Sequence, residues 1–156
     1  MSVIVIIDTT VFLNALDVPR FNQHRENVLS DLGALIAAPA ANLLLPLATI
    51  IEAGNHISHL ADGRLRRSSA LTFAEQVKLA IAGSAPWTPT QPITGADLNE
   101  LLDRFPDKAM QGIRLADLSI VREWELACQL HPRRRVRIWS LDNHLSGYDR
   151  PGKGRP

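Results

Sequence analysis

Three short apolar segments of the chain predict buried strands. Val3–Ile7 is a run of five β-branched residues, which is too short for a helix and lacks the alternation of a half-exposed strand. Leu43–Leu45 and Val136–Trp139 are expected to form a second and a third strand. Because helical patterns separate these segments, we expect an α/β fold with a parallel central sheet flanked by helices on both faces.

The helices are predicted from apolar stripes and from residues that favour helix ends. His24–Ala38 has apolar residues at i, i+4, i+7 and i+8, and Pro39 ends it. Thr94 and Asp97 have the spacing of a capping box, with Asp in place of the usual Glu. The proline-rich segment 86–92 is expected to be irregular. The segments predicted as helices are Val11–Leu16, His24–Ala38, Thr49–Leu60, Ser68–Ala82, Thr94 to about Arg104, and Ile113–Leu130.

Length and composition fit one globular domain. The chain has 156 residues, with 46% hydrophobic and 21% charged residues, which are ordinary proportions for a folded protein. Its end is rich in Gly, Pro and Arg. We therefore expect one folded domain over residues 1–148 and a flexible basic tail over residues 149–156.

The sequence favours a cytoplasmic protein without membrane contact. The first apolar run is followed at once by Asp8 and lacks the positive region of a secretory signal. Residues 32–51 are uncharged and about as long as a membrane span, but two prolines and a central Asn interrupt them. The single Cys128 cannot form an intrachain disulfide and is expected to pack in the core.

Four acidic residues fall where such a fold binds ligands. In parallel α/β sheets, ligands bind beyond the carboxyl ends of the strands. Asp8 follows the first predicted strand, Glu52 lies a short turn beyond the second, and Asp142 follows the third. Asp117 lies on the apolar face of its helix, where a carboxylate needs a partner, a hydrogen-bond network or a metal.

Each acid also has a purely structural interpretation. Asp8 has the chemistry of a helix cap, and Asp142 can open a turn. Glu52 has the spacing of the last residue of a capping box, Thr49–Glu52. The structural interpretation of Asp117 is an ion pair with one of two nearby arginines, Arg114 or Arg122.

A convergence of all four acids would favour a divalent cation. Crowded carboxylates repel one another at neutral pH, and hard oxygen ligands select Mg²⁺ or Mn²⁺. Two such ions about 3.5–4 Å apart can activate a water and stabilise the leaving oxygen in phosphodiester hydrolysis.

Four motifs occur in a fixed order along the chain. They are Ile6-Ile-Asp8-Thr9-Thr10, the mid-chain Glu52, Leu115-Ala-Asp117 and Ser140-Leu-Asp142. This ordered set resembles the PIN domain, and especially the VapC-type ribonuclease toxins of bacterial toxin–antitoxin pairs. The likeness extends to about Tyr148 and so covers nearly the whole chain.

The resemblance implies an endoribonuclease that uses Mg²⁺ or Mn²⁺ to hydrolyse phosphodiester bonds of single-stranded RNA. It also implies a cognate antitoxin protein as partner and, as in many relatives, a homodimer. The alternative is a catalytically degenerate PIN-like module that binds RNA or protein. By resemblance, catalysis and metal binding are assigned to Asp8, Glu52, Asp117 and Asp142, with Thr10 and Ser140 as supporting hydroxyls.

The chain departs from the family pattern at two places. Ser140 and Leu145 replace the usual Thr and Phe of the last motif. The stretch between Glu52 and Asp117 is longer than in compact members, and it contains the proline-rich segment. These departures leave the four acids intact but affect what can be inferred about substrate and partner.

Two further clusters have candidate chemistry. Arg133, Arg134 and Arg135 are candidates to bind RNA phosphates, although a solvated surface explains them equally well. The net charge of +1 favours neither interpretation. On the second predicted long helix, Glu52, His56 and His59 share one face and could ligate zinc, but a polar face beside a cleft accounts for them better.

Overall fold

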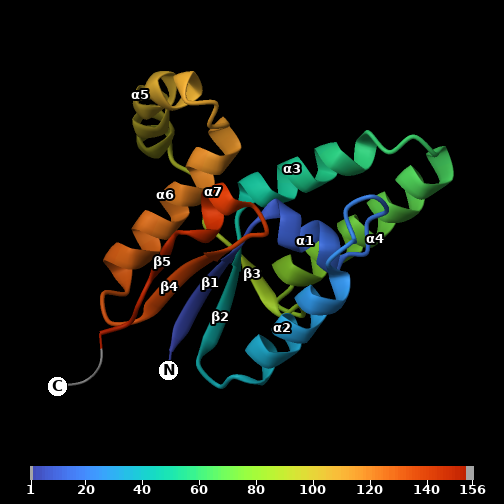
Figure 1. Ribbon diagram of the computed structural model, residues 1–156, viewed down its shortest axis with the longest axis horizontal. Coiled ribbons are helices and arrows are strands. Elements are labelled where there is room, and N and C mark those ends of the chain that lie inside the picture. The colour runs from blue at the N-terminus through green and yellow to red at the C-terminus, as the bar shows by residue number, and fades with distance from the viewer. Residues whose placement is uncertain (1, 154–156) are drawn as a thin grey trace.

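The computed structural model describes residues 2–153 and has a five-stranded sheet at its centre, in the order β3-β2-β1-β4-β5 (Figure 1). β1 pairs in parallel with β2 and with β4, β2 pairs in parallel with β3, and β4 pairs antiparallel with β5. The predicted α/β fold is confirmed, and its central sheet is parallel as expected except for the antiparallel edge strand β5. The strands are β1 (Val3–Ile7), β2 (Ala41–Leu45), β3 (Trp87–Pro89), β4 (Arg135–Trp139) and β5 (Asp149–Arg150).

Helices cover both faces of the sheet, as expected (Figure 1). On one face, Val5 and Ile7 of β1 pack in a core with side chains of the first four helices. On the other face, Ile4 and Ile6 pack against α6 and α7. The helices in the described residues are α1 (Thr9–Ala15), α2 (Arg25–Ala37), α3 (Leu47–Ser58), α4 (Gly63–Ile81), α5 (Gly95–Met110), α6 (Leu115–Leu130) and α7 (Asn143–Ser146).

Local chemistry explains where several helices begin. The predicted capping box of α5 is present, since the Thr94 hydroxyl accepts a hydrogen bond from Asp97 N–H and the Asp97 side chain accepts one from Thr94 N–H. The helix continues past its expected end to Met110, through an internal proline. Pro46 occupies the N-cap position of α3, which therefore starts two residues before Thr49. The capping-box interpretation of Glu52 is wrong for that reason.

The end of the chain differs from the expected flexible tail. Asp149 and Arg150 form β5, and the Arg150 guanidinium donates hydrogen bonds of 2.6–2.7 Å to three backbone carbonyls. Gly152 lies so close to the chain that a Cβ there would approach Arg133 O and Arg135 N at 3.0 Å. Regular structure thus extends beyond the boundary expected at Tyr148. The last residues of the expected tail, 154–156, lie outside the described residues.

The uncharged stretch 32–51 contains the end of α2, a turn, β2 and the start of α3. Among residues 2–153, none of the helices combines the length and the apolar character needed to cross a membrane. Cys128 packs against the core beneath α6, and burial raises the pKa of its thiol.

Candidate active site

The strand order creates a crevice where the carboxyl ends of β1 and β4 meet. After β1 the chain turns to one face of the sheet, and after β4 it turns to the other, so the two chain directions diverge there (Figure 1). Asp8 N–H donates to Trp139 O at 3.0 Å and holds the two strand ends together. Such a point is where open parallel sheets bind ligands.

Asp8 is fixed by hydrogen bonds to one of its two carboxylate oxygens. Its Oδ2 accepts from Thr10 N–H at 3.4 Å, from Thr10 Oγ1 at 2.9 Å and from Ser140 Oγ at 2.7 Å. The residue is buried, with 3% of its surface exposed. Asp8 therefore caps α1, as its structural interpretation predicted. The two hydroxyls expected to support it make direct contact with it.

Asp142 belongs to the same network from the β4 side. Its N–H donates to Ser140 Oγ at 2.9 Å, and its Oδ1 accepts from His144 N–H at 2.9 Å, which caps α7. Leu141 N–H donates to Thr10 Oγ1 at 3.0 Å. The turn chemistry predicted for Asp142 is confirmed. The strand-end rule thus brings the first and last acids to one cavity.

Glu52 reaches this place from α3. Thr49 Oγ1 donates to Ile7 O at 2.8 Å and so fastens the first turn of α3 over the end of β1. Glu52 is buried, and its Oε2 accepts from Thr9 Oγ1 at 2.9 Å. Its other oxygen forms an ion pair with the Arg114 guanidinium.

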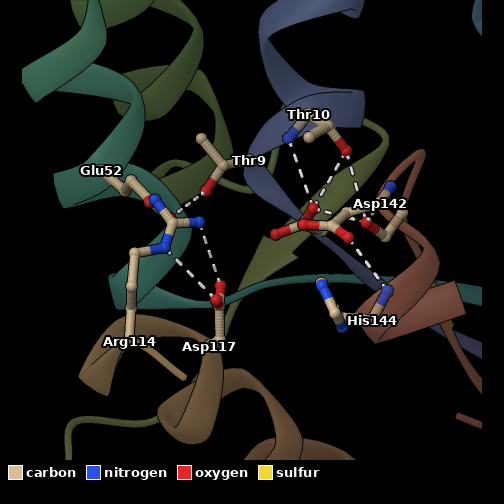
Figure 2. Close-up of polar contacts among 9 residues, drawn as sticks. Thr9, Thr10, Glu52, Arg114, Asp117, Asp142 and His144 are labelled. Carbon is tan, nitrogen blue, oxygen red and sulfur yellow. Dashed lines mark hydrogen bonds and ion pairs between the residues drawn. The ribbon is translucent and has the colours of Figure 1, made fainter. Parts of the chain in front are cut away.

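Arg114 links Glu52 to Asp117 (Figure 2). Its Nε and Nη2 each lie 3.3 Å from an oxygen of Asp117, which is three residues further along the chain. The expected arginine partner of Asp117 is therefore Arg114. The other candidate, Arg122, lies 2.6 Å from Asp97 and joins α6 to α5 instead.

The acids stabilise the positive charge of Arg114. Partial burial lowers the pKa of its guanidinium, but the hydrogen bond to Asp117 and the charges of Asp117, Glu52 and Asp8 outweigh burial, so the pKa is raised. Arg114 is therefore a permanent cation among the candidate acids. The influence of Asp8 on this pKa means that the field of the first acid reaches the guanidinium.

Three of the four acids line one cavity of about 340 Å³, together with Arg114. Asp117 lines a neighbouring cavity of about 280 Å³ that it shares with His144. Among residues 2–153, no three His, Cys, Asp or Glu side chains are arranged closely enough to hold a metal ion. The cavity acids are Asp8, Glu52 and Asp142.

The donor chemistry of the site fits Mg²⁺ or Mn²⁺, because carboxylate and hydroxyl oxygens line it. In the described part of the chain, the hydrogen bonds to Asp8 go to Oδ2 and that to Asp142 goes to Oδ1, which leaves the second oxygen of each for a ligand. Glu52 and Asp117 are instead engaged by Arg114. Both would have to exchange this guanidinium for a metal ion in order to become ligands.

The three arginines proposed to bind RNA lie away from this site. β4 starts at Arg135, so these residues lie at the amino-terminal end of this strand, whereas the acids lie beyond the carboxyl ends of the strands. Arg134 Nη2 donates to Val3 O at 3.1 Å and to Asn42 Oδ1 at 2.6 Å, and Arg135 pairs with Asp149 at 2.6 Å. These contacts show that the guanidinium groups of Arg134 and Arg135 hold strands together. Phosphate binding by Arg133, Arg134 and Arg135 stays a prediction.

His56 and His59, at the end of α3, do not form a metal site with Glu52 in the described residues. The His59 Nδ1 lies 2.7 Å from Asn55 O, on its own helix. The His56 ring packs against Phe21 at 4.9 Å between ring centres. The zinc interpretation therefore gains no support from the described residues.

Several residues of the cavity were not identified from the sequence. Arg114 was considered only as an ion-pair partner, and its contact with Glu52 bridges 62 positions of the chain. Asn14, 4% exposed, donates to Thr10 O at 2.8 Å and accepts from His24 N–H at 2.9 Å, so a buried amide orders the loop after α1. The sequence signal for Asn14 is a single polar residue among the apolar residues of Val11–Leu16.

Comparison with known proteins assigns no family to this chain. No protein-family model matches it, and no curated protein matches it either. The chain is thus characterised by its mostly parallel α/β fold and by a crevice in which carboxylates from two adjacent strand ends and one helix meet a single arginine.

Proposed function

We propose that the protein is a PIN-like, VapC-type endoribonuclease that hydrolyses phosphodiester bonds of single-stranded RNA with Mg²⁺ or Mn²⁺. One observation carries this proposal: Asp8 and Asp142, at the ends of adjacent parallel strands, line the same cavity as the buried Glu52. The order of the acidic motifs along the chain supports the same assignment.

The residues of the cavity divide into ligands and positioning groups. Asp8 and Asp142 each have a carboxylate oxygen left for a metal ion, while Thr10 and Ser140 fix the orientation of Asp8. Glu52 from the same cavity and Asp117 from the neighbouring one would complete the ligand set. When bound, the divalent cation would supply an activated water and stabilise charge on the leaving oxygen.

The proposed partners are an RNA substrate and, by resemblance, a cognate antitoxin and a second copy of the chain. A groove of about 380 Å³ between α3, α5 and α6 supports a protein partner, because exposed apolar side chains line it. Leu47, Ile51 and Leu98 in this groove are 50%, 55% and 42% exposed.

The alternative function is a catalytically degenerate module that binds RNA or protein. The contact of Arg114 with Glu52 and Asp117 favours it, because a guanidinium already balances these two carboxylates. Such a protein would need no divalent cation for its folded state.

Cleavage of a labelled single-stranded RNA separates the two functions. We expect cleavage with Mg²⁺ or Mn²⁺, none in EDTA, and losses of several orders of magnitude in Asp8→Asn and Asp117→Asn, because each removes a charged ligand. Asp62→Asn and Asp97→Asn are matched controls and should cleave normally. Asp62 caps α4 and Asp97 pairs with Arg122, both outside the cavity.

Cleavage that persists in EDTA, or in both site variants, would contradict the proposal. RNA binding without cleavage in the wild-type protein would establish the degenerate module.

A further inference from the structure

We propose that the part of the acidic cavity lined by Phe21 and His56 is a subsite for one nucleotide of single-stranded RNA. In this subsite the rings of Phe21 and His56 contact the base, and Arg20 binds the adjoining phosphate. This inference rests on the proposed function for the identity of the ligand. It assigns residues of the α1–α2 loop to substrate binding.

The acidic cavity continues directly onto the two rings. Phe21 and His56 line the same cavity as Asp8 and Glu52. Their ring centres are 4.9 Å apart and their planes are inclined by 53°, so the two rings pack against each other in a tilted arrangement. His56 lies one helical turn after Glu52 on α3, which fixes the rings next to the acids. Aromatic rings are the usual platforms for unpaired bases.

A second cavity adjoins the same two rings. Its volume is about 380 Å³, and Phe21 and His56 form the wall that it shares with the acidic cavity. Its other lining residues are Arg20, His59 and Leu60. The carboxylates and the rings thus line the first cavity, and the rings and the Arg20 cation line the second.

This arrangement matches what a nuclease substrate requires. The acids that hold a metal ion repel the other phosphates of the strand, so a cation beyond the base offsets that repulsion. None of the ion pairs in the described part of the chain includes Arg20. By contrast, acids already engage Arg114 and Arg135.

The loop that carries Arg20 and Phe21 is held in one conformation. Arg20 and Asp17 have φ angles of 72° and 58°, a left-handed region that residues other than glycine rarely adopt. Asn22 Nδ2 donates to Asp17 Oδ1 at 2.9 Å, and Gln23 Nε2 donates to Arg20 O at 2.6 Å. Strained backbone of this kind persists where the surroundings fix it, and it is common at ligand sites.

The test is the salt dependence of RNA binding, measured by fluorescence anisotropy with a labelled single-stranded oligoribonucleotide. The full-length Asp8→Asn protein serves as the parent, so that the RNA stays intact. We expect Arg20→Gln to weaken binding and to reduce the slope of log K against log salt by about 0.7, the value for one single-strand phosphate contact. Phe21→Leu should weaken binding about tenfold and leave the slope unchanged, because stacking releases no counterions.

Matched controls lie elsewhere on the surface. Arg64 is exposed near the start of α4, and Phe105 is partly exposed on α5, so Arg64→Gln and Phe105→Leu should bind RNA like the parent. The Phe21→Leu substitution keeps an apolar side chain against the core. If this variant nevertheless unfolds the loop, His56→Ala tests the subsite by removing the other ring.

Unchanged slope in Arg20→Gln, or equal losses in the site and control variants, would overturn the subsite. The cleavage assay of the wild-type protein keeps the two proposals apart. Cleavage with unaltered binding by the three loop and ring variants rejects the subsite alone. The expected binding pattern without cleavage supports the subsite and rejects the nuclease.

Discussion

Arg114 occupies the position of a counter-ion within the candidate site. Its guanidinium contacts both Glu52 and Asp117, which are two of the four expected metal ligands. A divalent cation and this side chain would compete for the same oxygens. The apparent affinity for the cation would then be lower than the intrinsic affinity, because the cation binds only those molecules in which the arginine has released the oxygens.

Removal of the competitor should therefore strengthen metal binding. We expect Arg114→Met to bind Mn²⁺ about tenfold more tightly than the wild-type protein in isothermal titration calorimetry. In EDTA the same variant should melt at a lower temperature, because the buried Glu52 loses its counter-charge. Arg104→Met removes a bidentate pair with Glu125 outside the site and should leave Mn²⁺ affinity unchanged. Equal affinity in wild type and Arg114→Met would show that the arginine does not compete.

The site residues whose position the sequence predicts correctly are those that directly follow a single strand. Asp8 and Asp142 come directly after apolar runs, and the strand-end rule assigns both to the crevice. The contacts of Arg114 with Glu52, and of Phe21 with His56, join segments far apart in the sequence. Such pairs depend on how α1, α3 and α6 pack, which no local pattern specifies.

The elements that sequence patterns failed to identify are the four-residue helix α7 and the two short outer strands. β3 has three residues within a proline-rich segment, and β5 has two residues near the end of the chain. Neither is long enough to have a hydrophobic period. Their backbone bonds to longer neighbours, and for β5 the contacts of Arg150, hold them in place.

Arg150 is expected to be a structural residue of β5. Its guanidinium donates to the carbonyls of Cys128, His131 and Arg134. Arg150→Met should lower the free energy of unfolding by about 1–3 kcal/mol, because these acceptors lose their donor. Thermal unfolding measures the effect, with the exposed Arg133→Met as control. A melting temperature equal to that of the wild type would assign these residues to a dispensable tail after all.

The candidate acids and two of the candidate arginines lie at opposite ends of the parallel strands. The acids are at the carboxyl ends, while Arg134 and Arg135 are at the amino-terminal ends and bind backbone or Asp149. Arg114 and Arg20 are the cations that accompany the acidic end.

The stability of the whole chain should report on Glu123, which lines the groove between α3, α5 and α6. Burial raises the pKa of this carboxyl above its ordinary value. As pH rises from the ordinary pKa through the raised one, the unfolded chain ionises first, so stability falls across that window and stays lower above it. Glu123→Gln should therefore be more stable than wild type at pH 7. The gain in the free energy of unfolding should be less than about 1 kcal/mol, because solvent screens the site.

The difference should disappear in acid, below the ordinary pKa of a glutamate, where both states are protonated. Melting curves from pH 3 to pH 8 measure it, and Glu75→Gln on the exposed side of α4 is the control. A Glu123→Gln protein that is less stable than wild type at pH 7 would show that a favourable contact outweighs burial.

The two outer strands also decide how copies of this protein can meet. Long unpaired strands at a sheet edge recruit strands from other chains, and this is a common start of aggregation. Here one edge ends with a three-residue strand closed by Pro89, which has no N–H to donate, and the other with two residues. Within residues 2–153, neither edge has an unpaired strand long enough to act as a template for another chain. Concentrated solutions should resist edge-to-edge fibril growth, and we expect any association between copies to use surfaces other than the sheet edges.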